Sequence, residues 1–107
     1  MSGIKRILVT GGTGFIGHHA VRLLKEKKYD VVVASRESNA SRGHYIADIL
    51  NPVSVDKMIR DIKPSHLLHL AWNVQDGYLE NIKNMDWVIA SLNLLKSFAE
   101  NGGNRAV

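Results

Sequence analysis

Short runs of aliphatic and β-branched residues recur along the chain, and longer stretches with helical spacing separate them. The first run is apolar almost throughout, as expected for a parallel strand that is covered on both faces. The strands predicted from these runs cover residues 4–9, 29–34, 44–47 and 66–70, with a fifth strand opening at 104–107. The polar stretch 35–43 and the segment around Gly77 are predicted to be loops.

Three stretches with a helical period lie between these strands. The first helix is predicted from Phe15 to about Lys27, and its core-facing positions are Ile16, Ala20, Leu23 and Leu24. A long third helix is predicted to begin near Leu79 or Asn84 and to end at Glu100, and its apolar positions are Val88, Leu92, Leu95 and Ala99. Glycines at 102 and 103 favour a left-handed ending.

The second helix has clear boundary signals. Asn51 suits the N-cap, Pro52 the first helical position, and Lys63-Pro64 the end. Its predicted apolar face consists of Val55, Met58, Ile59 and Ile62. The alternation of strands and helices predicts an α/β fold, a Rossmann-like doubly wound parallel sheet with strand order 3-2-1-4 and a fifth strand only begun.

Composition limits the class of protein. The 107 residues are 45% hydrophobic and 22% charged, which predicts one globular domain over residues 1–107. No apolar run has the length of a membrane span, no leader opens the chain, and the absence of cysteine excludes disulfides and thiolate metal sites. We expect a cytoplasmic protein.

The net charge of +4 raises the alternative of nucleic-acid binding. Lys25, Lys27 and Lys28 cluster at the end of the first helix, however, where cations complement the helix dipole. We favour that interpretation and expect no nucleic-acid partner. A modest positive balance also suits a protein that binds a polyanionic cofactor.

The segment Thr-Gly-Gly-Thr-Gly-Phe-Ile-Gly follows the first strand and opens the first helix. Gly11 permits a sharp turn, Gly14 lets a pyrophosphate approach the backbone, and Gly17 lets the helix pack tightly on the sheet. Chance glycines in an ordinary turn are the alternative. The strand before the motif and the helix after it favour a dinucleotide site.

This segment resembles the motif of the extended short-chain dehydrogenase/reductase family, which includes nucleotide-sugar epimerases, dehydratases and 4-keto reductases. The resemblance spans the whole chain, and the chain spans only the N-terminal part of the family. It implies that Gly11, Gly14, Phe15, Ile16 and Gly17 hold the pyrophosphate of NADP or NAD.

The end of the second strand bears on the choice of cofactor. Ser35 and Arg36 stand where such folds contact the adenosine ribose, and an arginine there accommodates the 2′-phosphate of NADP. Arg42 is a possible second clamp. NAD remains the alternative, in which Arg36 stacks on adenine or faces solvent and Glu37 reaches the ribose.

Two further segments resemble family positions. Asp48 resembles the residue that holds the adenine amino group, with the backbone of Ile49 against the ring, although Asp48 also suits the start of a helix. The segment His-Leu-Ala-Trp resembles the family's His-x-Ala-Ala, so Leu70 and Ala71 are expected to flank the pyrophosphate and the nicotinamide ribose. Trp72 replaces a small residue at the nicotinamide side.

On the third helix, Ser91-Leu92-Asn93-Leu94-Leu95 resembles the family's Thr-x-Asn-Leu-Leu. The family carries Asn four residues before that Thr, where this chain has Trp87. The resemblance implies that this helix packs in a dimer, and we expect a homo-oligomer, although plain core packing explains the apolar face equally well.

Metal binding is not expected. An odd offset along a strand points His66 and His69 to opposite faces, and the adjacent His18 and His19 also diverge. No tyrosine has lysine four residues later, so the family's catalytic Tyr-x-x-x-Lys pair is missing. Two hypotheses follow: the cofactor-binding part of an enzyme acting on a nucleotide sugar, or a non-catalytic dinucleotide-binding or interaction module without turnover.

Overall fold

The computed structural model describes residues 5–36, 43–72 and 82–107. Five parallel strands form one sheet in the order β3-β2-β1-β4-β5, which confirms the predicted fold class and order. The strands are β1 (Arg6–Thr10), β2 (Asp30–Ser35), β3 (His44–Ile46), β4 (His66–His69) and β5 (Arg105–Ala106). Their ends lie within two residues of the predicted ends, and β3 and β4 begin as predicted.

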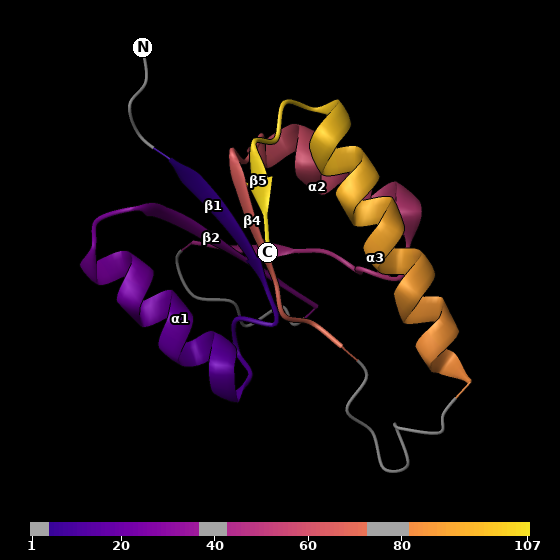
Figure 1. Cartoon of the computed structure of the whole chain (residues 1–107), viewed down its shortest axis with the longest axis horizontal. Helices are drawn as coiled ribbons and strands as arrows, with labels where there is room; N and C mark the ends of the chain where they lie inside the picture. The colour runs from indigo at the N-terminus through magenta and orange to yellow at the C-terminus, as the bar shows by residue number, and fades with distance from the viewer. Residues whose placement is uncertain (1–4, 37–42, 73–81) are drawn as a thin grey trace.

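Helices cover both faces of the sheet (Figure 1). Helix α1 (Phe15–Glu26) lies on one face, and α2 (Pro52–Ile62) and α3 (Lys83–Glu100) lie together on the other. Strand β1 is therefore buried from both sides: Leu8 packs in the core beneath α2 and α3, and Ile7 and Val9 pack in the core beneath α1. Within the described ranges no helix is long and apolar enough to cross a membrane.

Helix α2 has the predicted boundaries. The side chain of Asn51 accepts hydrogen bonds from the N–H groups of Val53 and Ser54, and Pro52 is the first helical residue. Lys63 ends the helix in a left-handed conformation with φ of 50°. All four predicted core positions are buried, namely Val55, Met58, Ile59 and Ile62.

Helix α1 buries only part of the predicted stripe: Leu24 packs inward and Ala20 is half-buried, as predicted, but Ile16 and Leu23 are not. Gly17 is buried, and Val21 and Leu24 pack against the sheet, whereas Ile16 is 68% and Leu23 53% exposed. The helix carries apolar residues on two adjacent faces, so periodicity alone does not choose between them. Gly17 has no side chain and packs closely on the backbone of the turn at Gly11 and Gly12, and Val21 and Leu24, one and two turns later, share its face.

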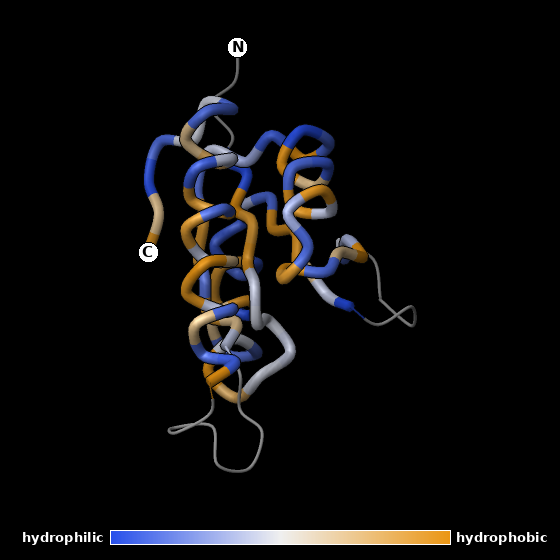
Figure 2. The backbone as a smooth tube through the Cα atoms, turned by 90° about the vertical axis from the view of Figure 1, so that its right-hand side faces the viewer, coloured by the Kyte–Doolittle hydropathy of each residue, from blue (hydrophilic) through white to orange (hydrophobic). Residues whose placement is uncertain are grey.

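Helix α3 also turns another face inward. The expected apolar positions Val88, Leu92, Leu95 and Ala99 are exposed, and the buried positions are Ala90, Leu94, Ser97 and Phe98. The Ser97 hydroxyl donates to Asp56 Oδ1 on α2 at 3.0 Å, which fixes the contact between the helices. Hydrophobic positions consequently recur along the outer side of α3, which faces the viewer in Figure 2. The helix closes at Gly102 with φ of 89°, as predicted.

Candidate functional site

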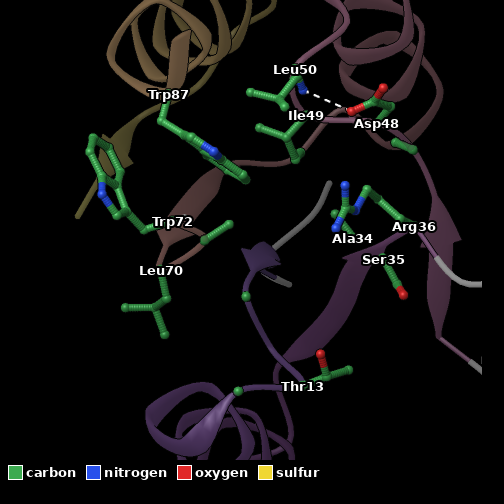
Figure 3. Close-up of a pocket in the computed structure, with 14 residues that line it drawn as sticks. Thr13, Ala34, Ser35, Arg36, Asp48, Ile49, Leu50, Leu70, Trp72 and Trp87 are labelled. Carbon is green, nitrogen blue, oxygen red and sulfur yellow. Dashed lines mark hydrogen bonds between the residues drawn. The ribbon is translucent and has the colours of Figure 1, made fainter. Parts of the chain in front are cut away.

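A cleft of about 310 Å³ opens where β1, β2 and β4 end (Figure 3). The chain leaves β1 toward β2 through α1 on one face, and it reaches β4 through α2 on the other. Loops on either side of β1 therefore diverge at these carboxyl ends, which is where open α/β sheets bind ligands. The predicted site residues that line the cleft are Gly11, Gly14, Ser35, Arg36, Asp48, Ile49, Leu70, Ala71 and Trp72.

The glycine turn forms the floor of the cleft between β1 and α1. Gly11 has φ of 72°, and a Cβ there would lie 2.7 Å from the backbone nitrogen of Ala71, so no other residue fits this turn. Gly14 differs: it has an ordinary φ of −77°, and a Cβ would meet only the Gly11 oxygen at 3.4 Å. The fold itself therefore does not require glycine at position 14.

Gly17 allows close packing, but against the turn and not against the strands as predicted. A Cβ at Gly17 would overlap the Gly11 carbonyl oxygen. Phe15 and Ile16 are exposed beside the cleft and do not line it, and the Phe15 ring contacts His19 edge-on. Of the five residues assigned to pyrophosphate, Gly11 and Gly14 alone line the cleft.

The N-terminus of α1 borders the cleft at Gly14. No described side chain caps this helix end, and its first turn holds no acidic residue. The unpaired N–H groups and the positive end of the helix dipole therefore lack an internal partner on the protein. Such a terminus is a ready site for an anion.

Polar and charged side chains occupy the cleft end formed by β2 and by the segment after β3. Arg36 is exposed and extends over Ala34 toward the middle of the cleft (Figure 3). Asp48 Oδ1 accepts from the N–H of Leu50 at 3.0 Å, so this carboxylate orders the turn before α2, although Asn51 is the cap. Both expectations for Asp48 are compatible with this geometry. Glu37 and Arg42 lie outside the described residues.

Two indole rings occupy the opposite end. Trp72 follows β4 and Trp87 lies in the first turns of α3, with ring centroids 6.2 Å apart and planes inclined by 40° (Figure 3). Trp87 also packs against the core beneath α2 and α3. The cleft therefore has a charged end, which holds Arg36 and Asp48, and an aromatic end, and the glycine turn lines it as well.

His69 connects the ends of β1 and β4 to α3. Its Nδ1 lies 2.6 Å from Thr10 Oγ1, and its Nε2 lies 2.8 Å from Ser91 Oγ. The Thr10 oxygen also accepts from the N–H groups of Leu70 and Ala71 at 3.1 and 3.2 Å. Burial lowers the pKa of His69 below its usual value of 6.5, so the ring is neutral at neutral pH.

His69 thus bonds to hydroxyl groups, and the His66 Nδ1 lies 2.8 Å from Ser65 Oγ. Among the residues that the structure describes, no group of three His, Asp or Glu side chains could hold a metal ion.

A tyrosine–lysine pair does exist, but away from the cleft lining. Tyr45 on β3 donates to Asp61 at 2.5 Å, and Lys57 lies 3.4 Å from the same phenol oxygen. The bond to Asp61 raises the pKa of Tyr45. A proton-transferring tyrosine needs a lowered pKa, so this pair is unsuited to that task.

Five lining residues were not expected from the sequence: Thr13, Ala34, Ala47, Leu50 and Trp87. Thr13 lies inside the glycine motif, and the next three adjoin predicted site residues, so strand-end position was an available signal for them. Trp87 is 15 positions beyond Trp72 in the chain. Its position in the cleft depends on where α3 begins and on how α3 packs against the sheet.

The sequence is similar to a known protein family and to individual proteins. The profile of the NAD dependent epimerase/dehydratase family matches residues 7–107. A GDP-6-deoxy-D-talose 4-dehydrogenase from Aggregatibacter actinomycetemcomitans is 40% identical over 67 residues, which cover 62% of this chain and 20% of that protein.

Solved structures resemble the fold closely. The UDP-glucose 4-epimerase of Thermus thermophilus in complex with NAD matches with a TM-score of 0.81 and 26% identity, covering 94% of this chain and 36% of that one. The UDP-glucose 4-epimerase of Thermotoga maritima with UDP-glucose matches with a TM-score of 0.79 and 30% identity over the same shares. The chain thus spans well under half the length of these relatives.

Proposed function

Since the chain belongs to the NAD-dependent epimerase/dehydratase family, we propose that its cleft binds a nicotinamide dinucleotide, with NADP preferred over NAD. One observation carries the proposal: the uncapped, acid-free N-terminus of α1 borders the cleft at Gly14, a glycine that the fold does not need. A glycine kept without an internal reason fits a ligand that approaches the backbone, and the helix end favours a phosphate there.

Each end of the cleft suits one part of the cofactor. Ser35 and Arg36 would receive the 2′-phosphate, because a guanidinium offers a fixed fork of donors to phosphate oxygens. Asp48 would accept from the adenine amino group, with the backbone of Ile49 against the ring. Leu70, Ala71 and Trp72 would flank the nicotinamide ribose, and Phe15, Ile16 and Gly17 would support the pyrophosphate site from outside the lining.

In the whole protein this cofactor would serve the epimerisation, dehydration or reduction of a nucleotide-activated sugar. The bound nicotinamide supplies hydride transfer. This chain's part would be to hold and orient the cofactor, and the proton-transferring Tyr-x-x-x-Lys pair would come from additional sequence. The missing pair also favours a second candidate, a dinucleotide-binding module without turnover. A turnover assay of the protein with NADP and nucleotide sugars separates the two.

We also propose a homodimer formed through α3. Its exposed side presents Met85, Val88, Ile89, Leu92 and Leu95, with the exposed Lys96 one turn after Leu92 on the same face. An apolar face of that extent on an amphipathic helix suits burial against an identical helix of a second copy.

Calorimetric titration with NADP and NAD tests the proposed cofactor. Arg36→Ala should weaken NADP binding by about 2–3 kcal/mol and change NAD binding little, because the variant loses a charge-assisted contact to the 2′-phosphate. Arg60→Ala is a matched control, since Arg60 carries the same charge on α2 outside the cleft lining. Equal losses for both dinucleotides in Arg36→Ala would show that Arg36 does not contact the phosphate.

A further inference from the structure

Trp72 and Trp87 are the only two tryptophans of the chain, and they lie against each other at the end of the cleft opposite Arg36 (Figure 3). They come from different elements, the segment after β4 and the start of α3. Trp87 is anchored, because it packs against the core beneath α2 and α3. Trp72 leans on it and stays 39% exposed.

The pair is placed to receive a ring. The indoles, Arg36 and the glycine turn at the N-terminus of α1 line the same cleft, so a ligand whose phosphates sit at that helix end can extend toward the indoles as well as toward Arg36. Leu70 adds an apolar surface beside Trp72. A flat ring entering this end would replace water on the indole faces, and stacking of a base on an aromatic side chain is favourable without specific hydrogen bonds.

Charge makes the wall selective between two forms of the same ring. The indole face is electron-rich and attracts cations, and tryptophan is the strongest aromatic residue in this respect. The oxidised nicotinamide ring carries a positive charge, and the reduced dihydronicotinamide ring is neutral. Among the described residues no acidic side chain lines this aromatic end, so the indoles themselves provide the preference.

We propose that Trp72 and Trp87 form an aromatic wall on which the nicotinamide ring of a bound dinucleotide stacks, and that the wall favours the oxidised, cationic ring over the reduced one. The proposal rests on the proposed function, since it requires a dinucleotide with its phosphates at the N-terminus of α1.

Indole fluorescence tests stacking directly, because the emission comes from these two residues alone. NADP⁺ and adenosine 2′,5′-bisphosphate, which lacks the nicotinamide, are titrated in parallel by calorimetry and by fluorescence. Both ligands should bind, and NADP⁺ alone should change the indole emission. If both ligands bind and change the indole emission equally, or if both bind and neither changes it, the proposed aromatic wall is wrong. Failure of both to bind in calorimetry overturns the proposed function, and the wall with it.

Substitution tests the preference for the oxidised ring. Trp72→Leu keeps apolar bulk and should lower the ratio of NADP⁺ to NADPH affinity about threefold to tenfold, whereas Trp72→Phe should retain most of it. Val53→Ala, an exposed change on α2 outside the cleft lining, is the control and should leave the ratio unchanged. An unchanged ratio in Trp72→Leu, or tighter NADP⁺ binding because the indole obstructs the site, contradicts the proposal. Thermal melting of each variant checks that the affinities belong to folded protein.

Discussion

The Nδ1 atom of His69 accepts a hydrogen bond from the hydroxyl of Thr10, 2.6 Å away. This direction follows from the partners around them. Ser91 donates its own hydroxyl proton to the Trp87 carbonyl oxygen at 2.8 Å, so its oxygen must accept from His69 Nε2–H. The proton on Nε2 leaves Nδ1 as an acceptor. The neutral tautomer with its proton on Nε2 therefore satisfies both hydrogen bonds of the His69 ring, to Thr10 on β1 and to Ser91 on α3.

A protonated His69 would break this arrangement, because Nδ1–H and the Thr10 hydroxyl proton would then face each other. Burial already lowers the pKa of His69 in the folded protein, while the unfolded chain keeps the usual value near 6.5. Below that pH the unfolded state binds the proton and the folded state does not. The free energy of unfolding should consequently fall as the pH drops below 6.5, by at most about 1.4 kcal/mol per pH unit from this group.

Urea unfolding between neutral pH and about pH 5 measures this dependence, and comparison with His69→Gln isolates the contribution of His69 from that of the other four histidines. The variant should be less stable at neutral pH and should lose part of the acid dependence. Parallel curves for the two proteins across the whole range would show that His69 keeps its ordinary pKa.

Two glycines in the same motif should respond differently to alanine. Gly17→Ala places a methyl group on the Gly11 carbonyl and should lower stability by about 1–3 kcal/mol. Gly14→Ala meets only an ordinary contact at 3.4 Å and should change stability by no more than about 0.5 kcal/mol. Thermal melting of both variants decides the matter, and comparable losses at the two positions would mean that Gly14 serves the fold after all.

The outer face of α3 should govern assembly. Leu92 is 61% exposed, and Leu92→Lys would put an uncompensated charge into the proposed helix–helix contact. Light scattering should give a dimer for the original protein and a monomer for the variant, with the helical content unchanged. Val53→Lys makes the same kind of exchange at a 78% exposed position on α2 and serves as the control, since it lies outside α3. A monomer in the original protein would refute the proposed dimer, and a dimer that survives Leu92→Lys would place the interface elsewhere.

The sequence contained the features that position the proposed phosphate site. Gly11 could be predicted because a sharp turn off a strand end demands a residue free of Cβ, and the α2 boundaries because Asn51 and Pro52 act locally. Local chemistry of this kind depends on neighbours a few positions away. Such features can therefore be predicted from the sequence without knowledge of the tertiary structure.

Tertiary choices were not predictable in the same way. Helices α1 and α3 each carry two apolar stripes, and the buried face of each contains small residues that pack closely: Gly17 against the turn before α1, and Ala90 with Ser97 in α3. The contact of Trp72 with Trp87 likewise depends on the position of α3 over the sheet. Both outcomes come from packing between segments that are distant in sequence.

Calorimetric titration of the original protein and of Gly14→Val with NADP tests most directly whether a dinucleotide phosphate lies against the backbone at Gly14, as proposed. The valine side chain would occupy the space that the pyrophosphate needs, while the ordinary φ of −77° accommodates it without backbone strain. We predict binding of one NADP per chain to the original protein and no measurable binding to Gly14→Val, with the circular dichroism of the two proteins alike. Undiminished NADP affinity in a folded Gly14→Val would contradict the assignment of the site.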